Sequence, residues 1–174
     1  IAVLLKQYSH QLIAADIDVD APNLSILFEP EEPSECTDSN NEEYTVQTTQ
    51  KAKLIELNCT QCKECITENF CSFNALSWDE EHQIPIIDVI ACEGCNGCEL
   101  LCTSSAFKVS PVDSGTITQI NSEYGIPVIT GETILGAQTS GKLVTELKKY
   151  AVQVARDEEA EIILYDGPTG IGCP

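Results

Sequence analysis

The sequence of 174 residues contains no methionine and a single tryptophan, and aromatic residues make up only 6% of it. It opens on Ile1-Ala-Val-Leu-Leu, which is typical of the interior of a helix, and it stops at Cys173-Pro174, just past a strand-like segment. From these features we infer a segment cut from a longer chain at both ends. No apolar run approaches the roughly 20 residues of a membrane-spanning helix, and no signal peptide is recognisable, so the sequence favours no membrane association.

Basic residues are also scarce. Nine lysines and arginines face 28 aspartates and glutamates, which gives a formal net charge of −19. A surface this negative repels phosphate backbones and anionic lipid headgroups. The composition therefore argues against nucleic acid and against membrane surfaces as partners.

Cysteine is the residue type in excess, because eight of the ten cysteines lie within residues 59–102. They form two runs of the pattern C-x2-C-x2-C, 33 residues apart, each followed by one more cysteine. The runs are Cys59, Cys62 and Cys65 followed by Cys71, and Cys92, Cys95 and Cys98 followed by Cys102. A tight loop with a sulfur at every third residue can direct three thiolates into one small volume, and in two-cluster ferredoxins the fourth ligand comes from the opposite run.

This spacing predicts two [4Fe–4S] clusters with crossed ligand sets. One set is Cys59, Cys62, Cys65 and Cys102, and the other is Cys92, Cys95, Cys98 and Cys71. The gap between Cys65 and Cys71 holds five residues, where the ferredoxin pattern has three. The longer gap leaves two alternatives open: a bulge that still delivers Cys71, or a second cluster with three protein ligands.

Two other uses of the cysteines were weighed. Disulfides are disfavoured because cysteines three residues apart on a tight loop are badly placed to pair, and a reducing, cytoplasmic setting fits better. Zinc sites with four cysteines also use C-x2-C pairs, but they rarely need a third cysteine at the same spacing. With iron–sulfur clusters, the acidic surface suits docking to a redox partner protein that has a basic surface. Cys36 and Cys173 are expected to be free thiols.

Outside the cysteine runs, the pattern predicts an α/β fold. Two apolar strands, at residues 12–17 and 161–166, each end in aspartate, and an amphipathic helix at 142–156 precedes the second one. Further strands are expected at residues 43–48, 54–57, 75–78, 84–88, 107–110, 115–120 and 126–130. Both aspartate-ending strands read as buried members of a parallel sheet. Ligands bind such sheets at the carboxyl ends of the strands, where Asp16, Asp18 and Asp166 lie.

The predicted domain order is a nucleotide-binding α/β domain at residues 1–51, a ferredoxin-like α+β insert at 52–110, and the continuation of the α/β domain at 111–174. The insert carries an internal repeat, since each half has a cysteine triplet, a short helix, a further cysteine and an apolar pair.

Four stretches together resemble a known family. They are residues 15–23 (ADIDVDAPN), the double cysteine run, residues 140–144 (SGKLV) and residues 165–174 (YDGPTGIGCP). This combination is similar to the MinD/ParA-type P-loop ATPases with an inserted ferredoxin domain, relatives of the nitrogenase iron protein and the Mrp-type iron–sulfur carriers. The resemblance implies a P-loop just before Ile1, ATP and Mg²⁺ as cofactors of the full-length protein, and a homodimer. Without its P-loop, the present chain is not expected to hydrolyse ATP.

The resemblance also implies roles for single residues. Asp18 would activate the water that attacks the γ-phosphate, with Asp16 beside it, and Asp166 would hold Mg²⁺. The turn from Gly167 to Gly170 would be a switch loop that senses the γ-phosphate. The expected function is electron transfer or cluster delivery coupled to ATP. The alternatives are an electron carrier on a catalytically inactive scaffold and a structural zinc module for assembly.

Overall fold

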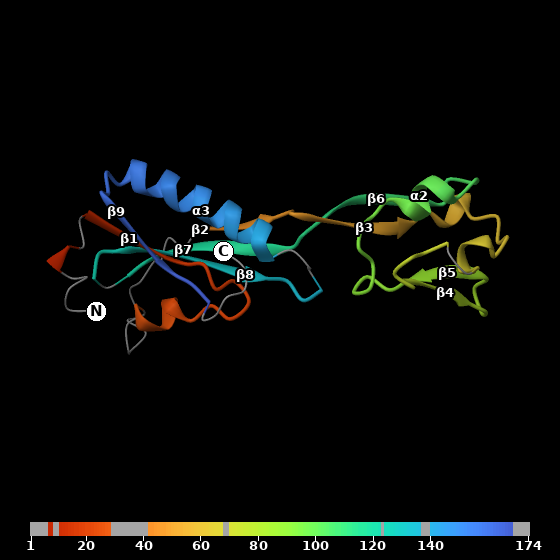
Figure 1. Ribbon diagram of the computed structural model, residues 1–174, viewed down its shortest axis with the longest axis horizontal. Helices are drawn as coiled ribbons and strands as arrows, with labels where there is room; N and C mark the ends of the chain where they lie inside the picture. Colours follow the sequence, from red (N-terminus) through yellow and green to blue (C-terminus); the bar gives the residue numbers. More distant parts are fainter. Residues whose placement is uncertain are drawn as a thin grey trace. The chain divides into compact units, whose positions relative to one another are not determined.

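The computed structural model describes residues 7–8, 11–28, 42–67, 70–122, 124–136 and 140–168, and the side chain of Ser140 is not among the described parts. The chain divides into two compact units (Figure 1). Unit 1 comprises Ile1–Val46, Ser114–Ile134 and Thr139–Pro174, and unit 2 comprises Gln47–Asp113 and Leu135–Gln138. No helix in the described ranges is both long enough and apolar enough to cross a membrane.

Unit 1 is built on a five-stranded sheet of order β2-β7-β8-β1-β9. The strands are β1 (Leu12–Asp16), β2 (Glu42–Val46), β7 (Gly115–Asn121), β8 (Pro127–Thr133) and β9 (Ile162–Asp166). Strands β8, β1 and β9 are parallel, whereas β2 and β7 run antiparallel to their neighbours. The prediction of a parallel sheet is therefore wrong for one side of it. The reason is local, because the short link between Asn121 and Pro127 permits only an antiparallel pairing. The fold class is mixed α/β.

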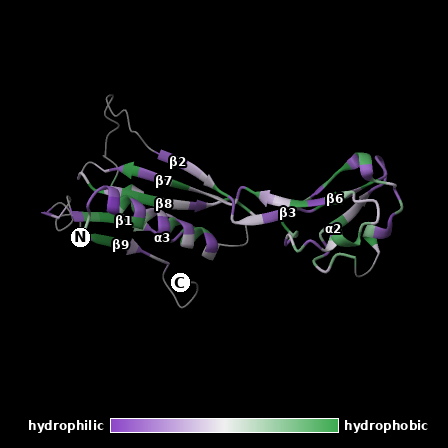
Figure 2. Ribbon diagram, turned by 90° about the horizontal axis from the view of Figure 1, so that it is seen from above, coloured by the Kyte–Doolittle hydropathy of each residue, from purple (hydrophilic) through white to green (hydrophobic). Residues whose placement is uncertain are grey.

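Strand β1 is the centre of the unit 1 core, and all five of its residues are buried. Ile13 and Ala15 pack in a cluster with Leu143 and Leu147 of helix α3 (Ser140–Asp157). The intervening residues of β1 face the opposite layer, which includes the short 3₁₀ helix η2 (Leu24–Leu27) and Phe28. Figure 2 shows β1 as a hydrophobic strand between these layers, as expected of a parallel strand covered on both faces.

Strand β9 is less buried than its apolar sequence predicts. Ile162, Leu164 and Tyr165 are each at least 39% exposed. The prediction of a second buried strand is wrong for the described residues, because β9 is the last strand at its side of the sheet. Its outer edge has no strand partner among the described residues.

Unit 2 consists of two antiparallel strand pairs and the loops that carry the cysteines (Figure 1). Strand β3 (Thr49–Leu54) pairs with β6 (Phe107–Val112), and β4 (Leu76–Asp79) pairs with β5 (Ile84–Ile87). Its short helices are η3 (Glu56–Asn58), η4 (Glu64–Ile66) and α2 (Gly97–Leu101). The expected strand at 54–57 is wrong, because β3 ends at Leu54 and the chain turns into η3. Unit 2 also extends beyond residues 52–110, since β3 begins earlier and β6 ends later.

We expect Leu147→Ala to lower the free energy of unfolding of unit 1 by about 2–5 kcal/mol, because Leu147 is fully buried between α3 and the sheet. Val152→Ala on the same helix is the matched control, since Val152 is 38% exposed, and it should change stability by at most about 0.5 kcal/mol. Urea unfolding followed by helical circular dichroism measures both. Equal effects of the two substitutions would contradict the assignment of this helix face to the core.

Candidate metal centres

The two cysteine runs share one backbone pattern. The second and fourth residues after the first cysteine have positive φ in both runs: Gln61 and Lys63 in the first, Gly94 and Asn96 in the second. Left-handed backbone at residues other than glycine is strained and persists where the surroundings enforce it, which is common at ligand clamps. The shared turns give both runs the same local path, and the sulfur atoms of each run line one cavity.

Site 1 is the cavity lined by Cys59, Cys62, Cys65 and Cys102, and its volume is about 350 Å³. Three of its cysteines come from the first run, and Cys102 follows the second run. The wall is completed by hydrophobic groups, including Phe70, Trp78, Pro85 and Phe107.

Site 2 is the cavity lined by Cys71, Cys92, Cys95 and Cys98, and its volume is about 610 Å³. Here Cys71 is the contribution from the first run. Despite the long gap after Cys65, the chain brings Cys71 to the second trio. Each of the two sets of four cysteines that the spacing predicts therefore lines a single cavity.

The two crossing cysteines, Cys71 and Cys102, have equivalent surroundings. The sulfur of Cys71 accepts a hydrogen bond from the N–H of Ala75 at 3.4 Å, and the sulfur of Cys102 accepts one from Ala106 at 3.4 Å. The Ser104 hydroxyl lies 3.3 Å from the Cys102 sulfur. Burial alone would raise the pKa of Cys102, but these hydrogen bonds outweigh burial and lower the pKa. Backbone donors of this kind stabilise a thiolate and adjust the potential of iron–sulfur clusters.

The sulfur atoms within each set are close enough to interact electrostatically. Burial raises the pKa of the Cys65 thiol, and the charges of Cys59, Cys62 and Cys102 raise it further. Burial likewise raises the pKa of Cys98 to about 11, with the charge of Cys92 adding to the shift. All eight cysteines in the described ranges are free thiols.

The sulfur atoms surround hollows and do not converge on a point. In the described part of the chain, no group of three or more His, Cys, Asp or Glu side chains is arranged to hold a metal ion. Four thiolates bound to one Zn²⁺ at about 2.3 Å would lie about 3.8 Å from one another. The arrangement has room for a polynuclear centre at each site.

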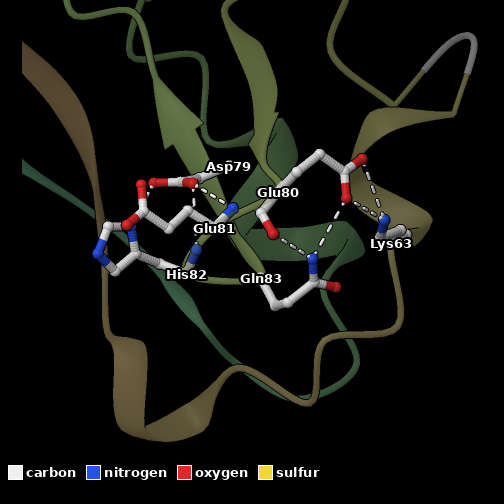
Figure 3. A network of polar contacts seen from close by, with 6 residues as sticks. All are labelled: Lys63, Asp79, Glu80, Glu81, His82 and Gln83. Atoms are coloured by element: carbon white, nitrogen blue, oxygen red, sulfur yellow. Dashed lines mark hydrogen bonds and ion pairs between the residues drawn. The ribbon is translucent and has the colours of Figure 1, made fainter.

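A polar network joins the first cysteine loop to the turn between β4 and β5 (Figure 3). The ammonium of Lys63 lies 3.0 Å from the Glu80 carboxylate and 5.0 Å from the centre of the Trp78 ring. Gln83 donates a hydrogen bond to the Glu80 backbone carbonyl at 2.6 Å. The indole Nε1 of Trp78 is buried and has no hydrogen-bond partner within the described residues. The sequence gave no signal for this network, because it depends on which turn faces the loop.

Unit 1 holds the predicted aspartates at one end of its parallel strands. Asp16 and Asp166 are neighbours in register on β1 and β9. Asp16 is 1% exposed, and its carboxylate accepts backbone N–H groups of Asp18, Asn23 and Leu24 at 2.8–3.0 Å. Asp16 therefore shapes the loop that carries Asp18.

The other predicted residues of this edge are more accessible. Asp18 is half-buried, whereas Asp166 and Gly167 are exposed. Gly170 and the two further cysteines, Cys36 and Cys173, lie outside the described residues. The edge thus offers carboxylates from two adjacent strands to solvent.

Comparisons with known proteins give two kinds of relative. The chain is 31% identical over 173 residues to an uncharacterized protein of Methanocaldococcus jannaschii, a match that covers 98% of this chain and 54% of that protein. It is also 40% identical over 56 residues to the indolepyruvate oxidoreductase subunit IorA of Pyrococcus horikoshii and of Pyrococcus abyssi, which covers 32% of this chain and 8% of each subunit. The chain thus spans about half the length of the first relative. No family model and no solved structure matches it.

We expect Gly94→Ala to disrupt site 2. Gly94 has a φ of +61°, and an added Cβ would overlap the backbone carbonyl oxygen of Gln50. Gly97→Ala is the matched control in the same loop, since its Cβ would lie at an ordinary 3.5 Å from the Cys95 sulfur. After reconstitution with iron and sulfide, Gly94→Ala should retain about half of the iron of the unmodified chain, as expected for loss of one of two equal clusters. Full iron retention by Gly94→Ala would contradict this reading of the loop.

Proposed function

We propose that unit 2 is a ferredoxin-like domain that holds two [4Fe–4S] clusters, one at site 1 and one at site 2, for electron transfer or cluster delivery. The observation that carries the proposal is the crossed lining of the two cavities, with three cysteines of one run and one of the other around each. A bound cluster supplies one-electron redox chemistry. The chain holds the iron through thiolates, shields it from water and donates hydrogen bonds to sulfur.

The residues around the cavities fit such a cluster. The walls combine thiolates with apolar side chains, and backbone N–H groups of Ala52, Ala75 and Ala106 already donate to cysteine sulfur. The partnerless N–H of Trp78 belongs to a residue that lines site 1, where cluster sulfur would be an acceptor. Buried donors in native proteins nearly always have a partner, so this one favours an anionic occupant.

Zinc fits the same residues less well. A mononuclear zinc site needs its thiolates at tetrahedral spacing around one ion, and the eight cysteines surround cavities instead. The match of 56 residues to a subunit named as an oxidoreductase also favours a redox role over a structural one.

For unit 1, we propose a nucleotide-binding domain of the MinD/ARA-like P-loop type, that is, the MinD/ParA class, which binds ATP and Mg²⁺ in the full-length protein. The support is the pair of adjacent parallel strands that end in Asp16 and Asp166, with Asp18 on a loop fixed by Asp16. In this proposal Asp18 activates the attacking water, Asp166 binds Mg²⁺, and Asp16 acts as a positioning residue.

The outer edge of β9 offers a place for the missing element of that domain. Unpaired strand edges with exposed apolar side chains are readily extended by another strand. Ile162, Leu164 and Tyr165 are exposed on β9, and we propose that the strand leading into the P-loop pairs there. Binding and release of the γ-phosphate would then order and disorder the loop after Asp166 and so gate the redox domain.

The crossed ligand sets predict a site-specific change in fluorescence. Trp78 is the only tryptophan and lines site 1, so a light-absorbing cluster at site 1 should quench its emission more strongly than one at site 2. Cys71→Ala should therefore keep the strong quenching on reconstitution, and Cys102→Ala should lose most of it. The apo forms of the same variants are the controls. Equal quenching in the two variants would overturn the assignment of Cys102 to site 1.

The nucleotide proposal is tested by ATP hydrolysis in the full-length protein. Asp18→Ala should lower kcat by about 10²–10⁴-fold, the usual contribution of a group that activates a nucleophile through its proton. Asp20→Ala is the control, because Asp20 is an exposed carboxylate on the same loop that accepts a hydrogen bond from Thr133. If the unmodified protein and Asp18→Ala are equally inactive, unit 1 is a scaffold and unit 2 acts as an electron carrier alone.

A further inference from the structure

The two halves of unit 2 are related by an internal repeat that allows the two sites to be compared position by position. A shift of 33 residues that carries Cys59 to Cys92 also carries Lys51 and Ala52 to Ile84 and Pro85. The strand pairs obey the same relation, since Leu54 lies opposite Phe107 as Ile87 lies opposite Leu76. Any difference between equivalent positions is therefore a difference between the sites.

The first difference is a backbone donor. The N–H of Ala52 donates to the Cys92 sulfur at 3.5 Å, beside site 2. The equivalent position at site 1 is Pro85, which lines the cavity and has no N–H. Site 2 thus receives a backbone hydrogen bond on a cysteine sulfur that site 1 lacks at this position.

The second difference is a buried lysine. Lys51 is only 8% exposed, and its ammonium donates to the backbone carbonyl of Cys92. The equivalent residue at site 1 is Ile84. None of the ion pairs found in the described ranges includes Lys51. A buried charge without a counter-charge is strongly destabilising, so a lysine in this position implies an anion nearby.

We propose that Lys51 is the counter-charge of the thiolate-bound cluster at site 2 and makes site 2 the easier of the two sites to reduce, so that the first electron entering unit 2 rests there. The proposal depends on the proposed iron–sulfur function. Reduction adds one negative charge, which a buried cation stabilises more than it stabilises the oxidised form. Ile84 gives site 1 no such stabilisation.

The test is potentiometric reduction of the reconstituted chain with dithionite, which supplies the electrons, monitored by EPR. Cys102→Ala isolates site 2 and Cys71→Ala isolates site 1, and Lys51→Met is added to each. At site 2, Lys51→Met should shift the balance of oxidised and reduced cluster about tenfold towards the oxidised form, which is about 59 mV for one electron. At site 1 the shift should be much smaller. Lys53→Met, an exposed lysine on the same strand, is the matched control.

The outcomes separate this inference from the function on which it depends. If no variant binds iron and sulfide, the proposed function fails. If clusters bind but Lys51→Met leaves the site 2 potential unchanged, or lowers both sites equally, the role of Lys51 is refuted. If the single-site variants lose both clusters, the two-step titration of the intact protein decides, because Lys51→Met should lower the higher potential.

Urea unfolding of the apo chain supplies a readout that does not need the clusters. Without the anion, the buried ammonium of Lys51 is a cost, so Lys51→Met should leave apo unit 2 as stable as before or more stable. A clear loss of apo stability would show that Lys51 serves packing and would contradict the assignment of its charge to the cluster.

Discussion

The structure of unit 2 depends on holding four cysteine sulfurs around one hollow, twice. Buried thiolates repel one another, and the raised pKa values of Cys65 and Cys98 reflect this crowding. The chain opposes the repulsion with left-handed turns that fix each run and with backbone N–H groups aimed at sulfur. The strand pairs β3–β6 and β4–β5 supply the walls. An iron core would neutralise the thiolates and link the halves, since each cavity takes a cysteine from both runs.

The cysteine spacing carried most of what could be predicted about unit 2, because the repeat of three residues dictates where sulfurs can point. Cys71 lines site 2 in spite of its longer approach, so the spacing within each triplet constrains the site more than the distance to the fourth cysteine does. Lys51 could not be found in the same way. Its strand was expected to begin later, and only the observed pairing of β3 shows that a lysine is enclosed there.

In unit 1 the apolar runs predicted β1, β9 and α3, since continuous hydrophobic strands and helical periodicity are local signals. The direction of β7 and the exposure of β9 are not local. They depend on the hairpin between β7 and β8 and on the order of strands in the sheet. Asp16 shows a related limit: its place at a strand end was evident, but its three backbone hydrogen bonds, which make it part of the loop's framework, required the fold.

The most direct test of the account is chemical analysis of the protein purified without oxygen, for iron, acid-labile sulfide and zinc together. Two [4Fe–4S] clusters predict about eight iron and about eight sulfide per chain, with an EPR signal after reduction. Zinc in place of iron, with no sulfide and no signal, would contradict the assignment of both cavities to iron–sulfur clusters.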